Sequence, residues 1–201
     1  MSHDKKIGRY VKSNKETVNF HEKAKDFITE AELEELVAAA KKSRHRWRDT
    51  ALLRVMFWHG MRVSEVCNLR QSDLDFKSGQ IFVRRIKGGL STHQPMLGDE
   101  LRSLKRYLKE RAHSALPWVF ITERGEQFTR FGINYLLRAI SERSALPFHV
   151  HPHMLRHGCG YALANRGRDT RLIQDYLGHR DIKHTARYTR TASVRFERVW
   201  D

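Results

Sequence analysis

Cysteine and long apolar runs are scarce in this sequence, and each scarcity excludes a class of protein. The 201 residues include two cysteines and four prolines. Cys67 and Cys159 form no CxxC pair, so we expect reduced, buried thiols rather than a disulfide or a redox motif. The N-terminal residues contain no apolar segment typical of a secretion signal, and no apolar run is long enough to predict a membrane span. These absences favour a cytoplasmic protein.

Acidic residues are also few relative to basic ones. The sequence has 23 Asp and Glu residues against 38 Lys and Arg residues, which gives a formal net charge of +15. An excess of this size favours a polyanionic partner, because Lys and Arg contacts release the counterions condensed on phosphates. The alternatives are a solvated basic surface and an anionic membrane, and the membrane is disfavoured since no basic amphipathic anchor stands out. We therefore predict binding to nucleic acid.

The spacing of apolar residues predicts a mainly α-helical α+β fold. Hydrophobic residues make up 40% of the chain, which is enough for one well-packed core. Thr29 and Glu32 form a capping box at the start of the first helix, and Gly60 follows an almost wholly apolar helix. The expected helices span residues 29–43, 48–59, 63–69, 99–113, 129–143, 152–165 and 170–177, and a further segment after Asp181 carries Tyr188.

Between residues 76 and 97 the apolar pattern changes from helical to alternating. The turn signals KSG and KGG bracket two strands, predicted at residues 80–86 and 91–97, which form a small antiparallel sheet. Lys87 lies at the tip of this hairpin beside two glycines. A lysine in such a place is usually solvated, but the glycines would also let the loop fold closely over a ligand. Both interpretations stay open at this point.

Several cationic and imidazole side chains are spaced so that they could meet one anionic ligand. His153 and Arg156 are three residues apart and share one face of a helix. His179 follows a helix-ending glycine, and Tyr188 comes nine residues later (188 − 179 = 9). Arg62 begins a short helix, where a guanidinium and a helix N-terminus together form an anion site. Each of these residues alone is more typical of a structural role, and for Arg62 the alternatives are pairing with a carboxylate or lying on the surface.

Taken together, these motifs resemble the catalytic domain of the tyrosine recombinase, or phage integrase, family over about residues 29–200. HPHMLRH and TRLIQDYLGHR are most similar to the fimbrial phase-switch recombinases, which invert a promoter segment and lack the N-terminal core-binding domain of longer integrases. Residues 1–26 are polar and basic without clear periodicity, so we predict a flexible basic arm there. The resemblance implies a single catalytic domain at residues 27–201, with a three-stranded antiparallel sheet. The matching residues are Arg62 in GMRVSE, Lys87 on the hairpin, His153 and Arg156 in HPHMLRH, His179 in LGHRD and Tyr188 in ARYT.

The same resemblance implies a mechanism for cleaving and rejoining DNA. Tyr188 is the nucleophile, which forms a covalent 3′-phosphotyrosine link and frees a 5′-hydroxyl, and Lys87 is the general acid for the leaving oxygen. Arg62 and Arg156 neutralise charge on the phosphate, and the two histidines of the matching set add hydrogen-bond donors. Because the covalent link preserves the ester, rejoining needs no ATP, metal or other cofactor. Glu65 is implied to hold the region of Arg62 in place.

Partners follow from the resemblance as well. We expect double-stranded DNA with specific recombination sites, a homo-tetramer on two such sites, and accessory DNA-bending proteins. The expected location is a bacterial-type cytoplasm, at the nucleoid, with no membrane partner. The apolar residues Phe196, Val199 and Trp200 either dock on a neighbouring protomer or pack on their own core.

Two other functions and a metal site are the alternatives. A DNA-binding regulator could keep the fold without catalysis, and a type IB topoisomerase uses similar residues for similar chemistry. The four histidines and one cysteine within residues 149–159 suggest zinc, but their spacing fits no common zinc pattern, so we predict no metal ion. In the same segment Gly158 and Gly160 lie inside a predicted helix, where glycine costs about 1 kcal/mol relative to alanine. We interpret them as close-packing sites, and the alternative is local flexibility.

Overall fold

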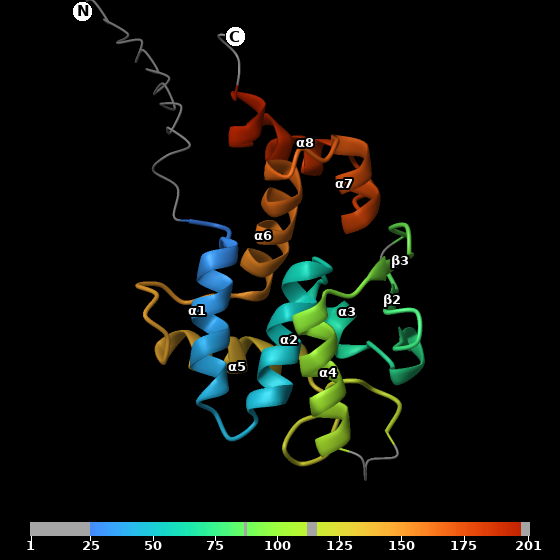
Figure 1. Cartoon of the computed structure of the whole chain (residues 1–201), viewed down its shortest axis with the longest axis vertical. Helices are drawn as coiled ribbons and strands as arrows, with labels where there is room; N and C mark the ends of the chain where they lie inside the picture. Colours follow the sequence, from blue (N-terminus) through green and yellow to red (C-terminus); the bar gives the residue numbers. More distant parts are fainter. Residues whose placement is uncertain (1–24, 87, 112–115, 198–201) are drawn as a thin grey trace, which may run out of the picture.

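The structure is a computed structural model that describes residues 25–86, 88–111 and 116–197. It is mainly helical with one small antiparallel sheet, which confirms the α+β fold (Figure 1). The predicted basic arm lies almost wholly outside the described residues. Within those residues, none of the helices is long and apolar enough to cross a membrane. The elements are α1 Glu30–Lys41, α2 Arg46–Trp58, α3 Val63–Cys67, β1 Leu74–Asp75, β2 Gln80–Val83, β3 Thr92–Pro95, α4 Gly98–Glu110, α5 Arg130–Glu142, α6 Pro152–Asn165, α7 Thr170–Leu177 and α8 Lys183–Arg190, with 3₁₀ turns at Gln71–Asp73 and Ser193–Arg195.

Helix α2 is the centre of the fold, as its apolar sequence predicts. Ten of its thirteen residues are buried, and it packs against α1, α4 and α6. The capping box at the start of α1 is present, since Glu32 N donates to Thr29 Oγ1 at 3.2 Å and Thr29 N donates to Glu32 Oε2 at 2.8 Å. Gly60 follows α2 with a φ of +52°, a left-handed conformation that glycine adopts without strain. This turn carries the chain from α2 into α3.

The three strands are antiparallel in the order β1-β2-β3, with Ile81 opposite Gln94. The strands predicted at residues 80–86 and 91–97 are correct in place but too long. The ladder stops early because the hairpin turns inward and its backbone bonds elsewhere. The amide of Ile86, for example, donates to a carboxylate oxygen of α3 at 3.3 Å rather than to a strand carbonyl.

Helices α1, α3 and α4 end two or three residues earlier than predicted, α1 at Lys41. Helix α3 stops at Cys67 because Asn68 turns its side-chain amide back to the Ser64 carbonyl oxygen at 2.7 Å. Helix α4 stops at Glu110, and Arg111 donates to a carbonyl oxygen of the following loop at 3.1 Å. At the end of α3 a side chain occupies a carbonyl oxygen of the last turn, and at the end of α4 a side chain bonds to the loop that follows. A periodicity of apolar residues reveals neither contact. Helices α6 and α7 lie where the sequence predicts them.

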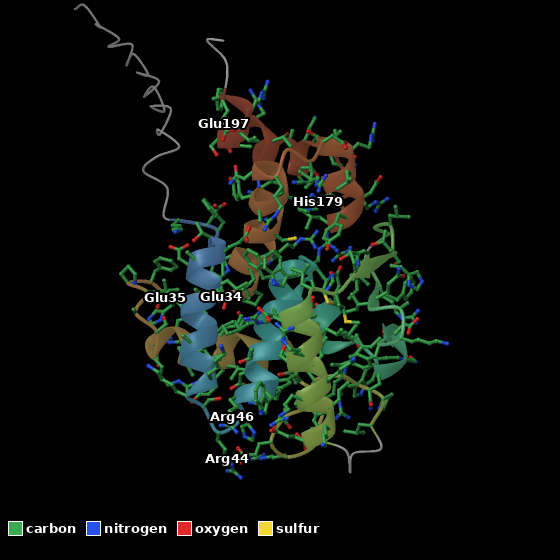
Figure 2. All side chains as sticks on the ribbon, in the orientation of Figure 1. Glu34, Glu35, Arg44, Arg46, His179 and Glu197 are labelled. Atoms are coloured by element: carbon green, nitrogen blue, oxygen red, sulfur yellow. The ribbon has the colours of Figure 1, made fainter. Side chains whose placement is uncertain are left out.

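Helices α6, α7 and α8 form the upper part of the molecule in Figure 1, beyond the end of α2 and beside the β2–β3 hairpin. This part, to which His179 belongs (Figure 2), has a small core of its own. Elements α1 to α5, the sheet and the base of α6 pack around the main core. Cys67 lies in the main core and Cys159 in the small one, and both are buried and free, as predicted. The small core contains Cys159, Ala164, Ile173, Leu177, Tyr188 and Ala192.

Candidate active site

Glu65, in the first turn of α3, is the buried anion at the centre of the site. Its Oε1 accepts from Arg62 Nη1 at 2.7 Å, and its Oε2 accepts from the Arg62 backbone N and from Arg85 Nη1, each at 2.8 Å. Burial alone would raise the pKa of the Glu65 carboxyl, but Arg85, Arg62 and Arg156 outweigh burial and hold that pKa below its ordinary value. Glu65 therefore stays ionised and holds the arginines in place.

Arg62 is the N-cap residue of α3 and keeps part of its guanidinium accessible. Its side chain is 28% exposed, and Nη2 lies 3.5 Å from the Gly178 carbonyl oxygen. A pairing of Arg62 with a carboxylate was one of the interpretations of its sequence position, and the ion pair with Glu65 confirms it. The pairing also orients the exposed edge of Arg62 for a ligand, since only one terminal nitrogen is taken by the carboxylate.

Arg156 projects from α6 to the same place but is buried. Its Nη1 donates to the Gly60 carbonyl oxygen and its Nη2 donates to that of Leu177 at 2.7 Å, so it joins the ends of α2 and α7. Its side chain is 4% exposed. Burial, with Arg62 and Arg85 nearby, lowers the pKa of Arg156 to about 9. The residue therefore remains a cation at neutral pH.

Arg85 is a third guanidinium of the site, which the predicted set does not contain. Its side chain is fully buried and its Nη2 donates to the carbonyl oxygens of His59, at 2.7 Å, and Tyr176. A signal for it was present in the sequence, because buried residues alternate along β2 and Arg85 continues the series of Ile81 and Val83. The residue ties the hairpin to the ends of α2 and α7.

Tyr188 lies on α8 with its ring fully buried. Its hydroxyl is 2.8 Å from Nδ1 of His157 and accepts from Arg187 Nη2 at 3.2 Å. The ring packs edge-on against Tyr161, with centroids 4.9 Å apart, and roughly parallel to His179 at 6.2 Å. Burial raises the pKa of the Tyr188 phenol above its ordinary value, and Arg187 offsets part of that rise. The predicted set contains neither His157 nor Arg187.

The imidazoles of the site are neutral at pH 7. Burial, with the charges of Arg156 and Arg62, lowers the pKa of His179 to about 3. Burial, with Arg187 beside it, does the same for His157. His179 Nδ1 lies 2.8 Å from Thr185 Oγ1. If that hydroxyl donates to Nδ1, the proton of the ring is on Nε2, which is then free to donate to a ligand.

Two predicted residues remain, His153 and Lys87, and the structure describes only the first. His153 is exposed on α6, with its ring 6.2 Å from those of His151 and His157, and burial together with Arg156 lowers its pKa. Lys87 lies outside the described residues. The hairpin on both sides of it packs against the site, since Ile86 bonds to the α3 carboxylate and a Cβ on Gly89 would lie 2.5 Å from the Gly178 carbonyl oxygen.

The histidine-rich segment was considered as a zinc site. Among residues 25–86, 88–111 and 116–197, the structure brings together no group of three or more His, Cys, Asp or Glu side chains able to hold a metal ion. Cys159 Sγ instead donates to the Trp58 carbonyl oxygen at 3.4 Å, and burial raises the pKa of its thiol to about 12. This cysteine is therefore a protonated core residue.

Gly160 makes the space that the tyrosine ring occupies. A Cβ at this position would lie 2.6 Å from Cε2 and 2.7 Å from Cζ of Tyr188, so we expect Gly160→Ala to displace the ring at a cost of about 1–3 kcal/mol. Acetylation with N-acetylimidazole, mapped by peptide mass spectrometry, should then reach Tyr188 in the variant and not in the unchanged protein. Gly158→Ala is the control, because its Cβ would meet the Ile28 backbone oxygen and destabilise the fold without exposing Tyr188. Equal protection in both variants would contradict this.

Residues 26–195 match the phage integrase family. The chain is 43% identical over 182 residues to the type 1 fimbriae regulatory protein FimB of Escherichia coli strain K12, covering 89% of this chain and 91% of that protein. FimE of the same strain is 40% identical over 179 residues, covering 87% and 90%. Among solved structures, the XerA recombinase crystal structure superposes with a TM-score of 0.75 at 29% identity, covering 85% of this chain and 62% of that one.

Proposed function

The chain belongs to the phage integrase family of tyrosine site-specific recombinases, and from that premise we propose that it cleaves and rejoins double-stranded DNA through Tyr188. The observation that carries the proposal is the packing of Tyr188 against His179, near the guanidiniums of Arg62 and Arg156 that pair with one buried carboxylate. The alternatives of a noncatalytic DNA-binding regulator and a type IB topoisomerase are not supported by the relatives.

In the proposed reaction the Tyr188 oxygen bonds to phosphorus and the bond from phosphorus to the 5′-oxygen breaks. The phenolic proton leaves through Nδ1 of His157, which lies 2.8 Å from the hydroxyl, and is passed on to solvent, because an imidazole with a pKa of about 3 does not retain it. Arg187 stabilises the developing phenolate. Lys87 gives its proton to the leaving 5′-oxygen. Rejoining is the reverse reaction, in which the 5′-hydroxyl oxygen attacks phosphorus and the Tyr188 oxygen leaves. It needs no external energy source, because one phosphate ester replaces another.

The phosphate would be held by the accessible edge of Arg62, the cation of Arg156 and neutral histidines. An imidazole that is neutral at pH 7 still donates through one N–H, so His179 and His153 serve as hydrogen-bond donors rather than as positive charges. Removal of one such donor raises the activation free energy by about 2.7–4 kcal/mol in comparable oxyanion sites. No cofactor or metal enters this mechanism.

The wider assignment rests on the relatives. We propose a homo-tetramer on two specific DNA sites, with accessory DNA-bending proteins, acting at the bacterial nucleoid in the cytoplasm. We propose DNA inversion as the reaction because the motifs resemble those of the fimbrial phase-switch recombinases, and the chain is 43% identical to the type 1 fimbriae regulatory protein FimB. The C-terminal patch remains a proposal too: Phe196 is 59% exposed and available for a neighbouring protomer, whereas Val199 and Trp200 lie outside the described residues.

Covalent trapping tests the proposed function. The DNA beside the gene is sequenced and searched for inverted repeats, and a duplex carrying one such repeat is nicked beside its cleavage point, so that the short strand with the 5′-hydroxyl diffuses away. We expect an SDS-resistant protein–DNA complex whose nucleotide-bearing peptide contains Tyr188. Absence of a complex on this duplex would reject the enzyme and favour the regulator. Relaxation of a supercoiled plasmid without the repeats would favour the topoisomerase instead.

A further inference from the structure

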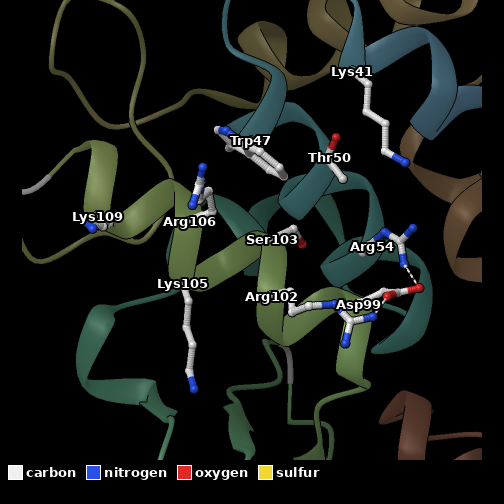
Figure 3. A pocket seen from close by; sticks show the side chains of 10 residues that line it. All are labelled: Lys41, Trp47, Thr50, Arg54, Asp99, Arg102, Ser103, Lys105, Arg106 and Lys109. Atoms are coloured by element: carbon white, nitrogen blue, oxygen red, sulfur yellow. Dashed lines mark hydrogen bonds and ion pairs between the residues drawn. The ribbon is translucent and has the colours of Figure 1, made fainter.

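A basic groove lies between α2 and α4, apart from the residues of the active site (Figure 3). Its volume is about 600 Å³, which is large enough for a small organic ligand. One wall is α2, the other is α4, and the end of α1 contributes Lys41. None of the arginines, histidines or tyrosines of the proposed reaction lines it.

The groove is strongly positive. Six of its lining residues are cations and one, Asp99, is an anion. Asp99 is already neutralised, since its carboxylate pairs with Arg102 and lies 3.3 Å from Arg54 Nη1. Arg102, Arg106 and Lys109 follow one another along α4 at helical spacing, so they share a face of that helix. The excess of positive charge calls for an anionic ligand.

The wall formed by α2 contains buried polar atoms without hydrogen-bond partners among the described residues. These are Trp47 Nε1, Thr50 Oγ1 and Arg54 Nε, and their residues share one face of α2. Thr50 and Arg54 are 2% and 6% exposed, and the terminal nitrogens of Arg54 are fixed by Glu34, at 3.1 Å, and Asp99. Buried donors are nearly always satisfied in folded proteins. Two of the three atoms are donors only, so what they lack is an acceptor.

We propose that this groove binds the phosphate of a nucleotide unit. Oxygens of a phosphate accept from guanidinium and indole N–H groups at once, and its charge matches the cations on both walls better than one carboxylate would. Two guanidiniums lie near the Trp47 ring, with that of Arg46 at 5.5 Å and that of Arg106 at 5.4 Å from the ring centroid. An aromatic and cationic surface of this kind is typical of nucleotide binding. The phosphate belongs either to a DNA strand or to a free nucleotide. The site goes beyond the recombination chemistry and does not depend on it.

The indole N–H of Trp47 gives a local test, independent of the active site. The full-length protein is labelled with ¹⁵N at tryptophan side chains, and the Trp47 signal is assigned with Trp47→Phe. We expect this signal to shift during titration with the dinucleotide pTpT. A double variant, Lys41→Gln with Arg106→Gln, should weaken pTpT binding about tenfold or more, because two charge-assisted contacts are lost.

A matched control distinguishes binding in the groove from attraction of pTpT to the overall positive charge of the protein. Lys77→Gln with Arg124→Gln removes the same charge from exposed turns outside the groove and should leave pTpT affinity unchanged. Thr50→Val keeps all charges and removes one unpaired hydroxyl, so we expect weaker pTpT binding from a protein at least as stable as the original. This variant keeps the test valid if the double variant folds poorly.

The titrations also identify the source of the phosphate. Equal affinity for dTMP and pTpT supports a free nucleotide, and tighter binding of pTpT supports a DNA strand. A Trp47 signal that does not move with either probe would overturn the proposal. So would stronger binding of hexaglutamate, which would make the groove a docking site for an acidic protein, or equal losses in the groove and control double variants.

Discussion

The Tyr188→Phe protein is expected to form no covalent complex with nicked duplex DNA while it binds intact DNA as the original does. The hydroxyl is the atom that would bond to phosphorus, so its loss removes the reaction completely rather than slowing it. The ring itself stays, and with it the packing against Tyr161 and His179. Loss of the contacts to His157 and Arg187 should cost only about 1 kcal/mol of folding free energy.

The neighbouring phenol is the control for this prediction. Tyr161→Phe removes a hydroxyl from the ring packed edge-on against Tyr188, but we assign that hydroxyl no chemical role. This variant should form the covalent complex at nearly the rate of the unchanged protein. Both proteins are compared by gel electrophoresis in SDS, and DNA binding by fluorescence anisotropy. A complex that persists in Tyr188→Phe would show that another side chain is the nucleophile.

Burial of the nucleophile has a consequence for the reaction. Tyr188 is 0% exposed, so its oxygen cannot touch a phosphate in the described conformation. The small core that holds the ring is made of few residues, and two of its three helices, α7 and α8, have only eight residues each. A small unit of this kind opens at low free-energy cost. We therefore expect DNA binding to shift α8 and bring the hydroxyl to the phosphate held by Arg62.

Much of the helical fold was predictable because its signals are local. Thr29 and Glu32 mark the start of α1, Asp169 caps α7 through the amides of Arg171 and Leu172, and Gly178 ends it in the left-handed conformation. Such caps depend on residues within one turn of each other. The strand ends were mispredicted because long-range contacts decide them: the hairpin turns inward to bond with α3.

The site was predictable only as far as motifs and helical spacing reach. Arg156 and His179 are in the motifs, and the structure places Arg156 beside the buried carboxylate of Glu65 and His179 beside the ring of Tyr188. The alternation along β2 predicts that Arg85 is buried, but it does not predict its partners. Those contacts join three distant segments of the chain. Arg187 precedes Tyr188 in the sequence, yet its contact with His157 requires α6 and α8 to pack together.

Glu65→Gln is expected to have the largest effect on stability of any single conservative change at the site. The substitution keeps the shape of the side chain but removes the negative charge between Arg62, Arg85 and Arg156. The side chains of Arg85 and Arg156 are 0% and 4% exposed, so water cannot replace the lost partner. Breaking a buried ion pair by removing one partner costs about 3–5 kcal/mol, which we expect as the loss in unfolding free energy in urea at neutral pH.

The surface pair of Glu142 and Arg138 provides the control. Their side chains are 50% and 67% exposed and four residues apart on α5, where an ion pair contributes about 0.5 kcal/mol or less. Glu142→Gln should therefore unfold at nearly the same urea concentration as the unchanged protein. A loss in Glu65→Gln no larger than in Glu142→Gln would contradict the central role of the buried carboxylate.

The pH dependence of the same two proteins tests the charge itself. The pKa of Glu65 in the folded protein is below its ordinary value, so the unfolded chain binds a proton first as the pH falls. Its contribution to stability is thus present above about pH 4.3 and is lost as the pH falls toward the lower folded pKa. Unfolding free energies measured from pH 7 to pH 3 should converge for Glu65→Gln and the unchanged protein at the acidic end. A constant difference over that range would mean that packing or hydrogen bonding, rather than the ionised carboxylate, holds the three arginines together.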